Sequence, residues 1–139
     1  MRHLVREAGL ERAVEIDSAA TGAWHIGEQA DDRTRAAGER RGFCVDSIAR
    51  QVVLADFERF DYLVAMDAGH VRELERMAPT REARSKVRLL RSFDPASPAG
   101  AAVPDPYYGG ADGFEEVLDI CEAGCRGLLA ELVRVHGLR

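Results

Sequence analysis

The feature that most limits how this chain can fold is the apolar run at residues 62–66, Tyr-Leu-Val-Ala-Met, which is followed by Asp67. Such a run is typical of a strand that is covered on both faces within a parallel sheet. Asp67 stands at an N-cap position, and apolar residues at helical spacing predict a helix from there to Pro79. Because parallel strands need a crossover connection, which is usually a helix, the run favours an α/β fold with a parallel sheet.

Shorter patterns predict the remaining strands and helices. Alternation at residues 14–17 and an apolar segment at residues 87–90 indicate two more strands. Helices are expected at residues 1–9, from Asp31 or Asp32 to about Arg41, and from near Ala111 through Leu132. Gly9 and Gly42 follow the first two helices as natural stops. The predicted architecture is a three-layer α/β fold with a parallel sheet, in a single domain over residues 1–139.

The composition limits the partners and the compartment that we expect. A net charge of −5 argues against general affinity for nucleic acid or an anionic membrane, because both favour clustered Lys and Arg. No apolar run approaches the ~18 residues of a membrane span, and the N-terminal residues lack the apolar region of a secretory signal. Three cysteines, an odd number, indicate reduced thiols, so a cytoplasmic protein is expected. No metal site is predicted, because ligand-like spacing is missing among His3, His25, His70 and His136.

The stretch at residues 103–110, Val-Pro-Asp-Pro-Tyr-Tyr-Gly-Gly, carries the clearest sign of chemistry. It ends a loop, residues 92–110, that is long for a simple connection in a compact domain. Asp105 lies between two prolines, whose fixed φ angles place its carboxyl group through the backbone. An acid held beside Tyr107 and Tyr108 is suited to donate a proton next to an aromatic slot. Such chemistry also requires a nucleophile, and no obvious one accompanies this stretch.

Five collinear blocks carry a resemblance to a known family; they lie at residues 17–28, 49–51, 60–67, 86–95 and 105–110 and read DSAATGAWHIGE, ARQ, FDYLVAMD, KVRLLRSFDP and DPYYGG. Through them the chain resembles the low-molecular-weight protein tyrosine phosphatases over nearly its whole length. In that family, a cysteine on a Cys-x5-Arg-Ser loop attacks the phosphorus of phosphotyrosine. The loop amides and the arginine hold the phosphate, and the same positive field favours the thiolate. The resemblance implies phosphotyrosine proteins or small phosphomonoesters as substrates, a cysteinyl-phosphate intermediate and no cofactor.

The resemblance also assigns catalytic and substrate-binding residues. Asp105 corresponds to the general acid that protonates the leaving phenolate and later acts as the base that activates water. Trp24, Tyr107 and Tyr108 correspond to the aromatic wall that admits a flat phenyl ring. From the residues alone, Trp24 also suits a structural clamp on its own loop, and the tyrosines also suit surface packing.

Two further residues receive supporting roles. Ser18 corresponds to a hydroxyl that supports the phosphate loop from behind, and Asp67 is a second supporting residue. As residues of their local elements, Ser18 equally suits an ordinary strand end, and Asp67 an ordinary helix cap.

By the same resemblance, the family's first strand and its phosphate loop lie N-terminal to Met1, which corresponds to the middle of the family's first helix. That strand is central in the family's four-stranded parallel sheet. We therefore expect a gap between the strands near Ile16 and near Val64, where buried backbone groups without partners would cost roughly 1–3 kcal/mol each. Phosphatase activity is not expected of these 139 residues alone, and a mis-assigned start of translation is the preferred explanation.

One pair within the chain satisfies Cys-x5-Arg literally, namely Cys44 and Arg50. The intervening residues include no glycine and contain β-branched Val45 and Ile48, which resist the backbone of an anion nest. Asp46 would also repel a phosphate. We therefore interpret Cys44 as a small, partly buried thiol and not as the nucleophile.

Two alternatives to an active phosphatase remain open at this point. The chain could be a non-catalytic interaction module that keeps the aromatic cleft and forms a homo-oligomer or a complex with a partner. Arsenate reduction on the same fold is a weaker option, because Cys121 and Cys125 fall on the apolar face of a helix and are poorly placed for redox exchange.

Overall fold

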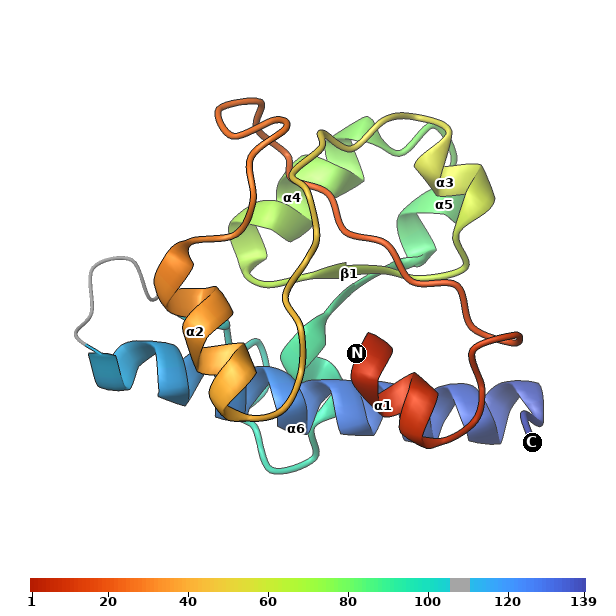
Figure 1. The fold of residues 1–139 in the computed structure, drawn as a ribbon. Coiled ribbons are helices and arrows are strands. Elements are labelled where there is room, and N and C mark those ends of the chain that lie inside the picture. The colour runs from red at the N-terminus through yellow and green to blue at the C-terminus, as the bar shows by residue number, and fades with distance from the viewer. Residues whose placement is uncertain (106–110) are drawn as a thin grey trace.

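The structure of the protein is a computed structural model that describes residues 1–105 and 111–139 (Figure 1). Its elements, in chain order, are α1 (Arg2–Glu7), α2 (Asp32–Arg40), α3 (Asp56–Arg59), β1 (Leu63–Ala65), α4 (Ala68–Met77), α5 (Arg81–Ser85), β2 (Val87–Leu89), the 3-10 helix η1 (Leu90–Phe93) and α6 (Ala111–His136). None of the described helices is both long and apolar enough to cross a membrane.

The predicted parallel pairing is confirmed for two strands, the one in the apolar run at residues 62–66 and the one at residues 87–89. β1 pairs in parallel with β2, with Leu63 opposite Val87 and Ala65 opposite Leu89. The helix α4 makes the crossover, and the Asp67 side chain caps it by accepting a hydrogen bond from the backbone N–H of His70 at 2.8 Å.

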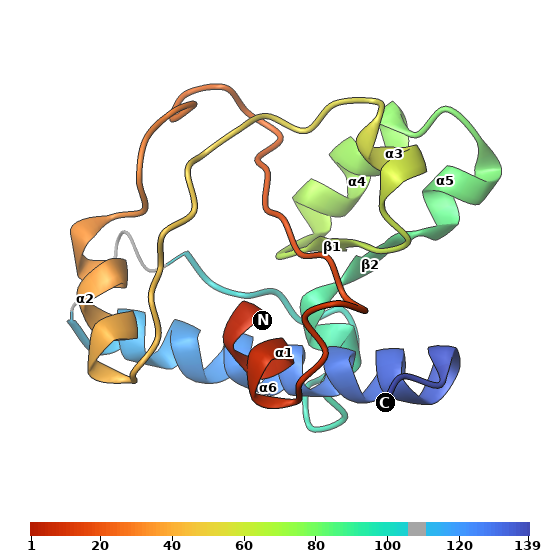
Figure 2. The same cartoon turned by 45° about the vertical axis from the view of Figure 1, so that its right-hand side comes forward.

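Helices cover both faces of this small sheet. Leu63 and Ala65 of β1 are buried among side chains of α3, α4 and α5, with Phe57 at the centre. Val64 packs on the opposite side, with Leu128 of α6. The views agree, since α3, α4 and α5 lie on one side of β1 while α1 and α6 lie on the other (Figures 1 and 2). This alternation confirms that the apolar run is a strand buried on both faces.

Residues 14–17 do not form a strand, so the prediction of a third strand is wrong. Ladder hydrogen bonds require a neighbouring strand in register. In the described chain, the carbonyl oxygen of Ile16 instead accepts a hydrogen bond from Nη2 of Arg2 at 3.1 Å. An isolated parallel bridge joins Ala20 to Gln51 a few residues later. The sheet of the described residues therefore contains β1 and β2 only.

The predicted helices at both ends of the chain and at residues 31–41 are confirmed. Asp31 caps α2 by accepting from the N–H of Arg33 at 2.8 Å, and Gly42 follows that helix with a φ of 82°. Gly9 follows α1 with a φ of 68°. The short helices α3 and α5 were missed, because four and five residues are too few to show a helical period.

Two glycines let α6 approach η1 more closely than larger residues would allow. A Cβ atom at Gly127 would lie 1.9 Å from the carbonyl oxygen of Phe93, and one at Gly124 would lie 2.8 Å from Cγ of Leu90. The carbonyl of Phe93 belongs to the backbone, so it cannot move away by a change of rotamer. The position of η1 against α6 therefore depends on these two positions.

We expect Gly127→Ala to destabilise the fold by about 1–3 kcal/mol, because the added methyl group overlaps the carbonyl of Phe93. Urea unfolding at pH 7 measures the change. Gly113→Ala in the same helix is the matched control, since a Cβ there meets nothing within 4 Å. That control should stabilise the protein by about 0.5–1 kcal/mol through helix propensity. Equal stability of the two variants would contradict the proposed contact.

Candidate functional site

The loop that carries Asp105 is attached to the end of β1. The N–H of Val103 donates to the carbonyl oxygen of Met66 at 2.8 Å. One turn beyond β2, Nη1 of Arg91 donates to the carbonyl oxygen of Ala102 at 2.8 Å. These two bonds place the exposed residue Asp105 beside the carboxyl end of the sheet, where ligands bind in open α/β folds.

Asp67, at the same end of β1, has a clear structural task. Its Oδ1 atom caps α4 through the N–H of His70 and lies 3.4 Å from the Nδ1 atom of that histidine. The hydrogen bond of Val103 to Met66 brings the Asp105 loop beside this cap. A supporting role for Asp67 in catalysis stays a prediction.

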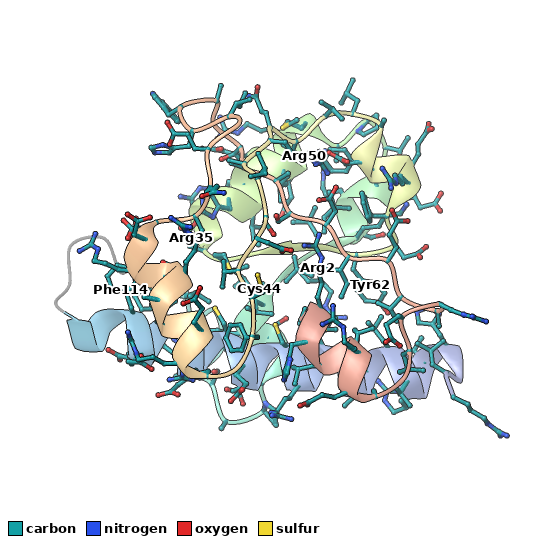
Figure 3. The ribbon with its side chains drawn as sticks, viewed as in Figure 1. Arg2, Arg35, Cys44, Arg50, Tyr62 and Phe114 are labelled. Carbon is teal, nitrogen blue, oxygen red and sulfur yellow. The ribbon has the colours of Figure 1, made fainter. Side chains whose placement is uncertain are left out.

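Ser18 lines a cavity of about 210 Å³ at the start of α1. The cavity is bounded by three segments, residues 1–3, 16–18 and 43–47. Arg2 and Cys44 enter it from separate segments of the chain (Figure 3). The N–H of Ser18 donates to Oδ1 of the neighbouring Asp17 at 2.8 Å.

Trp24 projects from a loop at residues 21–27, which we call the Trp24 loop. Its side chain is 87% exposed, and its indole ring lies against Gly22, where a Cβ atom would be 2.1 Å from Cζ3 of the ring. A glycine is thus needed for this ring position. The bond from Val103 to Met66 brings the segments that carry Asp105 and Asp67 side by side at the end of β1, whereas Ser18 and Trp24 both lie on the stretch that leads into and through the Trp24 loop. The predicted wall residues Tyr107 and Tyr108 lie outside the described residues.

A cluster of charges that sequence reasoning missed lies at the base of the Trp24 loop. The guanidinium of Arg50 donates to both carboxylate oxygens of Asp56 at 3.0 Å and, through Nε, to Oδ2 of Asp17 at 3.1 Å. The Asp56 carboxylate also accepts from the N–H of Val53 at 2.8 Å, which satisfies this nearly buried charge. The hydrogen bonds from Arg50 are the main cause that lowers the pKa of Asp56 below its ordinary value, against the effect of burial.

In the sequence, Arg50 stands out only as the partner of Cys44 in a Cys-x5-Arg pair and as part of a family block. In the structure, two carboxylates hold its guanidinium, and Arg50 and Cys44 are well separated in Figure 3. This geometry disfavours a phosphate nest between Cys44 and Arg50.

Cys44 is exposed, because its segment lines the open cavity at the start of α1, so the prediction of a partly buried thiol is wrong. The other two thiols lie in a different environment. Cys121 and Cys125 are partly buried on α6, and burial is the main cause that raises the pKa of Cys121 to about 11. A thiol with such a pKa is protonated at neutral pH. Among the side chains that the structure describes, those of residues 1–105 and 113–139, no group of three His, Cys, Asp or Glu residues is arranged to hold a metal ion.

Residues 1–136 match the family described as "Low molecular weight phosphotyrosine protein phosphatase". The chain belongs to this family. A low molecular weight protein-tyrosine-phosphatase of Streptomyces coelicolor is 55% identical over 130 residues, which are 93% of this chain and 79% of that protein. A low molecular weight phosphotyrosine protein phosphatase of Schizosaccharomyces pombe is 43% identical, over 81% of this chain and 72% of its own length.

Solved structures of the phosphatase family share the fold. A protein tyrosine phosphatase from Entamoeba histolytica, crystallised with Hepes in its active site, superposes with a TM-score of 0.91 at 38% identity. The match covers 97% of this chain and 85% of that one. The recognised family and the α/β fold are therefore confirmed, whereas the roles of individual residues stay predictions.

We expect Gly22→Ala to displace the indole of Trp24, because the added methyl group would overlap the ring. Trp24 is the only tryptophan, so selectively excited tryptophan fluorescence and the indole bands of the near-ultraviolet circular dichroism spectrum report on this ring alone. Both spectra should change while the far-ultraviolet spectrum stays the same. Gly113→Ala is the control with open space at its Cβ, and identical indole spectra for Gly22→Ala and wild type would contradict the contact.

The ion pair of Asp56 should make stability depend on pH in one direction. Its folded-state pKa lies below the ordinary 3.8, so its contribution is present above that value and is lost as the pH falls through the folded pKa. Asp56→Asn should lower the urea midpoint at pH 7. When the pH falls below about 4, the variant should lose less stability than the wild type loses. Asp61→Asn, at an exposed position, is the control. An unchanged acid profile in Asp56→Asn would contradict this linkage.

Proposed function

We propose that this chain serves the hydrolysis of phosphotyrosine monoesters, as a single domain over residues 1–139, with Asp105 as the general acid. The observation that carries the proposal is the attachment of the Asp105 loop to the end of β1, through the bond from Val103 to Met66, in a chain of this phosphatase family. That position suits an acid that must meet a phosphate bound at the carboxyl end of the strands.

The chemistry needs a proton at one defined moment. A phenolate whose acid has a pKa of about 10 leaves slowly unless it is protonated in the transition state, and general acid catalysis contributes typically 10²–10⁴-fold. Asp105 would supply that proton and would then accept one from the water that hydrolyses the cysteinyl-phosphate. Trp24, Tyr107 and Tyr108 would line the slot for the substrate ring, which suits a phosphotyrosine protein or a small aryl phosphomonoester.

The proposal assigns the nucleophile to a Cys-x5-Arg-Ser loop outside these 139 residues, in a segment that would lead into α1. Two observations support this assignment. Arg50, the arginine of the internal Cys-x5-Arg pair, is held by carboxylates, and Ser18 lines the cavity at the start of α1, where such a loop would arrive. Ser18 and Asp67 would then act as supporting residues.

The comparisons do not favour the alternative of a non-catalytic interaction module. The relatives in Streptomyces coelicolor and Schizosaccharomyces pombe are both named as phosphatases. Homo-oligomer formation remains a separate expectation, which sedimentation of the purified chain would test.

We expect residues 1–139 alone to release no p-nitrophenol from p-nitrophenyl phosphate. The same chain preceded by a strand and a Cys-x5-Arg-Ser loop should be active. In that longer form, Asp105→Asn should lower kcat by roughly 10²–10⁴-fold with phenyl phosphate. The loss should be much smaller with 2,4-dinitrophenyl phosphate, whose leaving group departs without a proton.

Asp61→Asn, which changes an exposed carboxylate, is the matched control and should keep full activity. Turnover by residues 1–139 that disappears in Cys44→Ser would show that the internal cysteine is the nucleophile after all. Equal losses with the two leaving groups would refute Asp105 as the general acid.

A further inference from the structure

We propose that Arg50 is a positioning residue that fixes the Trp24 loop for binding of the substrate ring. The ring-binding part of this inference rests on the proposed function. The positioning part rests on contacts in the described chain and can be tested without any turnover.

Both ends of the Trp24 loop are hydrogen-bonded to one short segment, residues 49–52. At the first end, the N–H of Ala20 donates to the carbonyl oxygen of Arg50 at 2.8 Å, and the carbonyl oxygen of Ala20 accepts from Val52 at 2.9 Å. At the other end, the N–H of Gly27 donates to the carbonyl oxygen of Ala49 at 2.8 Å. The position of the Trp24 loop therefore depends on the position of residues 49–52.

The side chain of Arg50 fixes that segment to the core. Asp56, its bidentate partner, is 6% exposed and begins the helix α3. The next residue, Phe57, is 1% exposed and lies in the main hydrophobic cluster. A charge-assisted pair to a carboxylate held in this way restricts both the position and the orientation of the guanidinium.

The same guanidinium reaches the chain that enters the loop. Its Nε atom donates to Oδ2 of Asp17 at 3.1 Å, and the other oxygen of Asp17 accepts from the N–H of Ser18. Three segments therefore meet at one planar group, namely the entry to the loop, the segment that closes it and the start of α3. Lysine cannot reproduce this arrangement, because an ammonium group lacks the fixed directions of the guanidinium donors.

Trp24 itself has little else to hold it. Its side chain is 87% exposed, and its close contact is with Gly22 of the same loop. The position of the ring relative to the core therefore depends on the position of the base of the Trp24 loop. We infer that loss of the Arg50 contacts would free the ring while leaving the helices and the β1–β2 pair intact.

A simpler explanation is that Arg50 only adds to the free energy of unfolding, as other partly buried ion pairs do. Arg41 separates the two explanations, because it also joins two carboxylates. Its Nη2 atom lies 2.8 Å from Glu115 and 2.8 Å from Asp119 on α6. Substitution of Arg41 should therefore affect stability without affecting Trp24.

The test is time-resolved fluorescence anisotropy of Trp24 in residues 1–139, the single tryptophan of the chain. Arg50→Lys and Arg50→Gln should raise the amplitude of the fast, nanosecond component roughly twofold. Arg41→Lys and Arg41→Gln should leave it at the wild-type value. Far-ultraviolet circular dichroism and urea unfolding establish which variants are folded and how stable each is.

Asp17→Asn keeps the result decisive if the Arg50 variants do not fold, because it weakens the link to the loop entry and leaves the Asp56 pair in place. It should raise the fast component in the same direction. A wild-type anisotropy decay in folded Arg50→Lys or in Asp17→Asn would overturn the proposal, as would an equal change in the Arg41 variants. Failure of the phosphatase assay would leave this readout unaffected, so the two hypotheses fail separately.

Discussion

Burial of β1 between two layers of helices is the constraint on which the rest of the structure depends. Leu63 and Ala65 face one cluster and Val64 the other, so this short strand joins both halves of the core. β2, α4 and η1 take their positions from it through pairing, crossover and packing. The Asp105 loop is then attached at its carboxyl end. Because both faces of this strand are apolar and must be covered, few arrangements of the surrounding helices are possible.

The two loops of the candidate site are held to the core by different sets of hydrogen bonds. The acid loop has one backbone hydrogen bond to Met66 and accepts one side-chain hydrogen bond from Arg91, so its approach to the sheet is fixed at two points. The Trp24 loop is held through Arg50 and its carboxylate partners. Both segments are thus connected to the core by polar contacts near their bases, and Asp105 and Trp24 themselves are exposed.

The sequence predicted the features that depend on local patterns. Spacing and residue type predict three features that are all present. These are the strand buried on both faces at residues 62–66, the helix caps at Asp31 and Asp67, and the long helix that begins at Ala111. The strand at residues 14–17 was predicted from alternation alone. Alternation describes the two faces of a strand but not the neighbour that must pair with it, and no ladder forms there. The Arg50 cluster joins residues 17, 50 and 56, a meeting that only the folded chain reveals.

The close contact of α6 with η1 links a remote helix to the acid. Gly127 touches the carbonyl of Phe93, and two residues earlier Arg91 holds the carbonyl of Ala102, close to Asp105. A sideways shift of the helix would therefore be transmitted along this short path to the carboxyl group. Under the role proposed for Asp105, changes in side-chain volume along that helix are the place to look for an altered leaving-group preference among natural variants, even where every residue of the proposed site is identical.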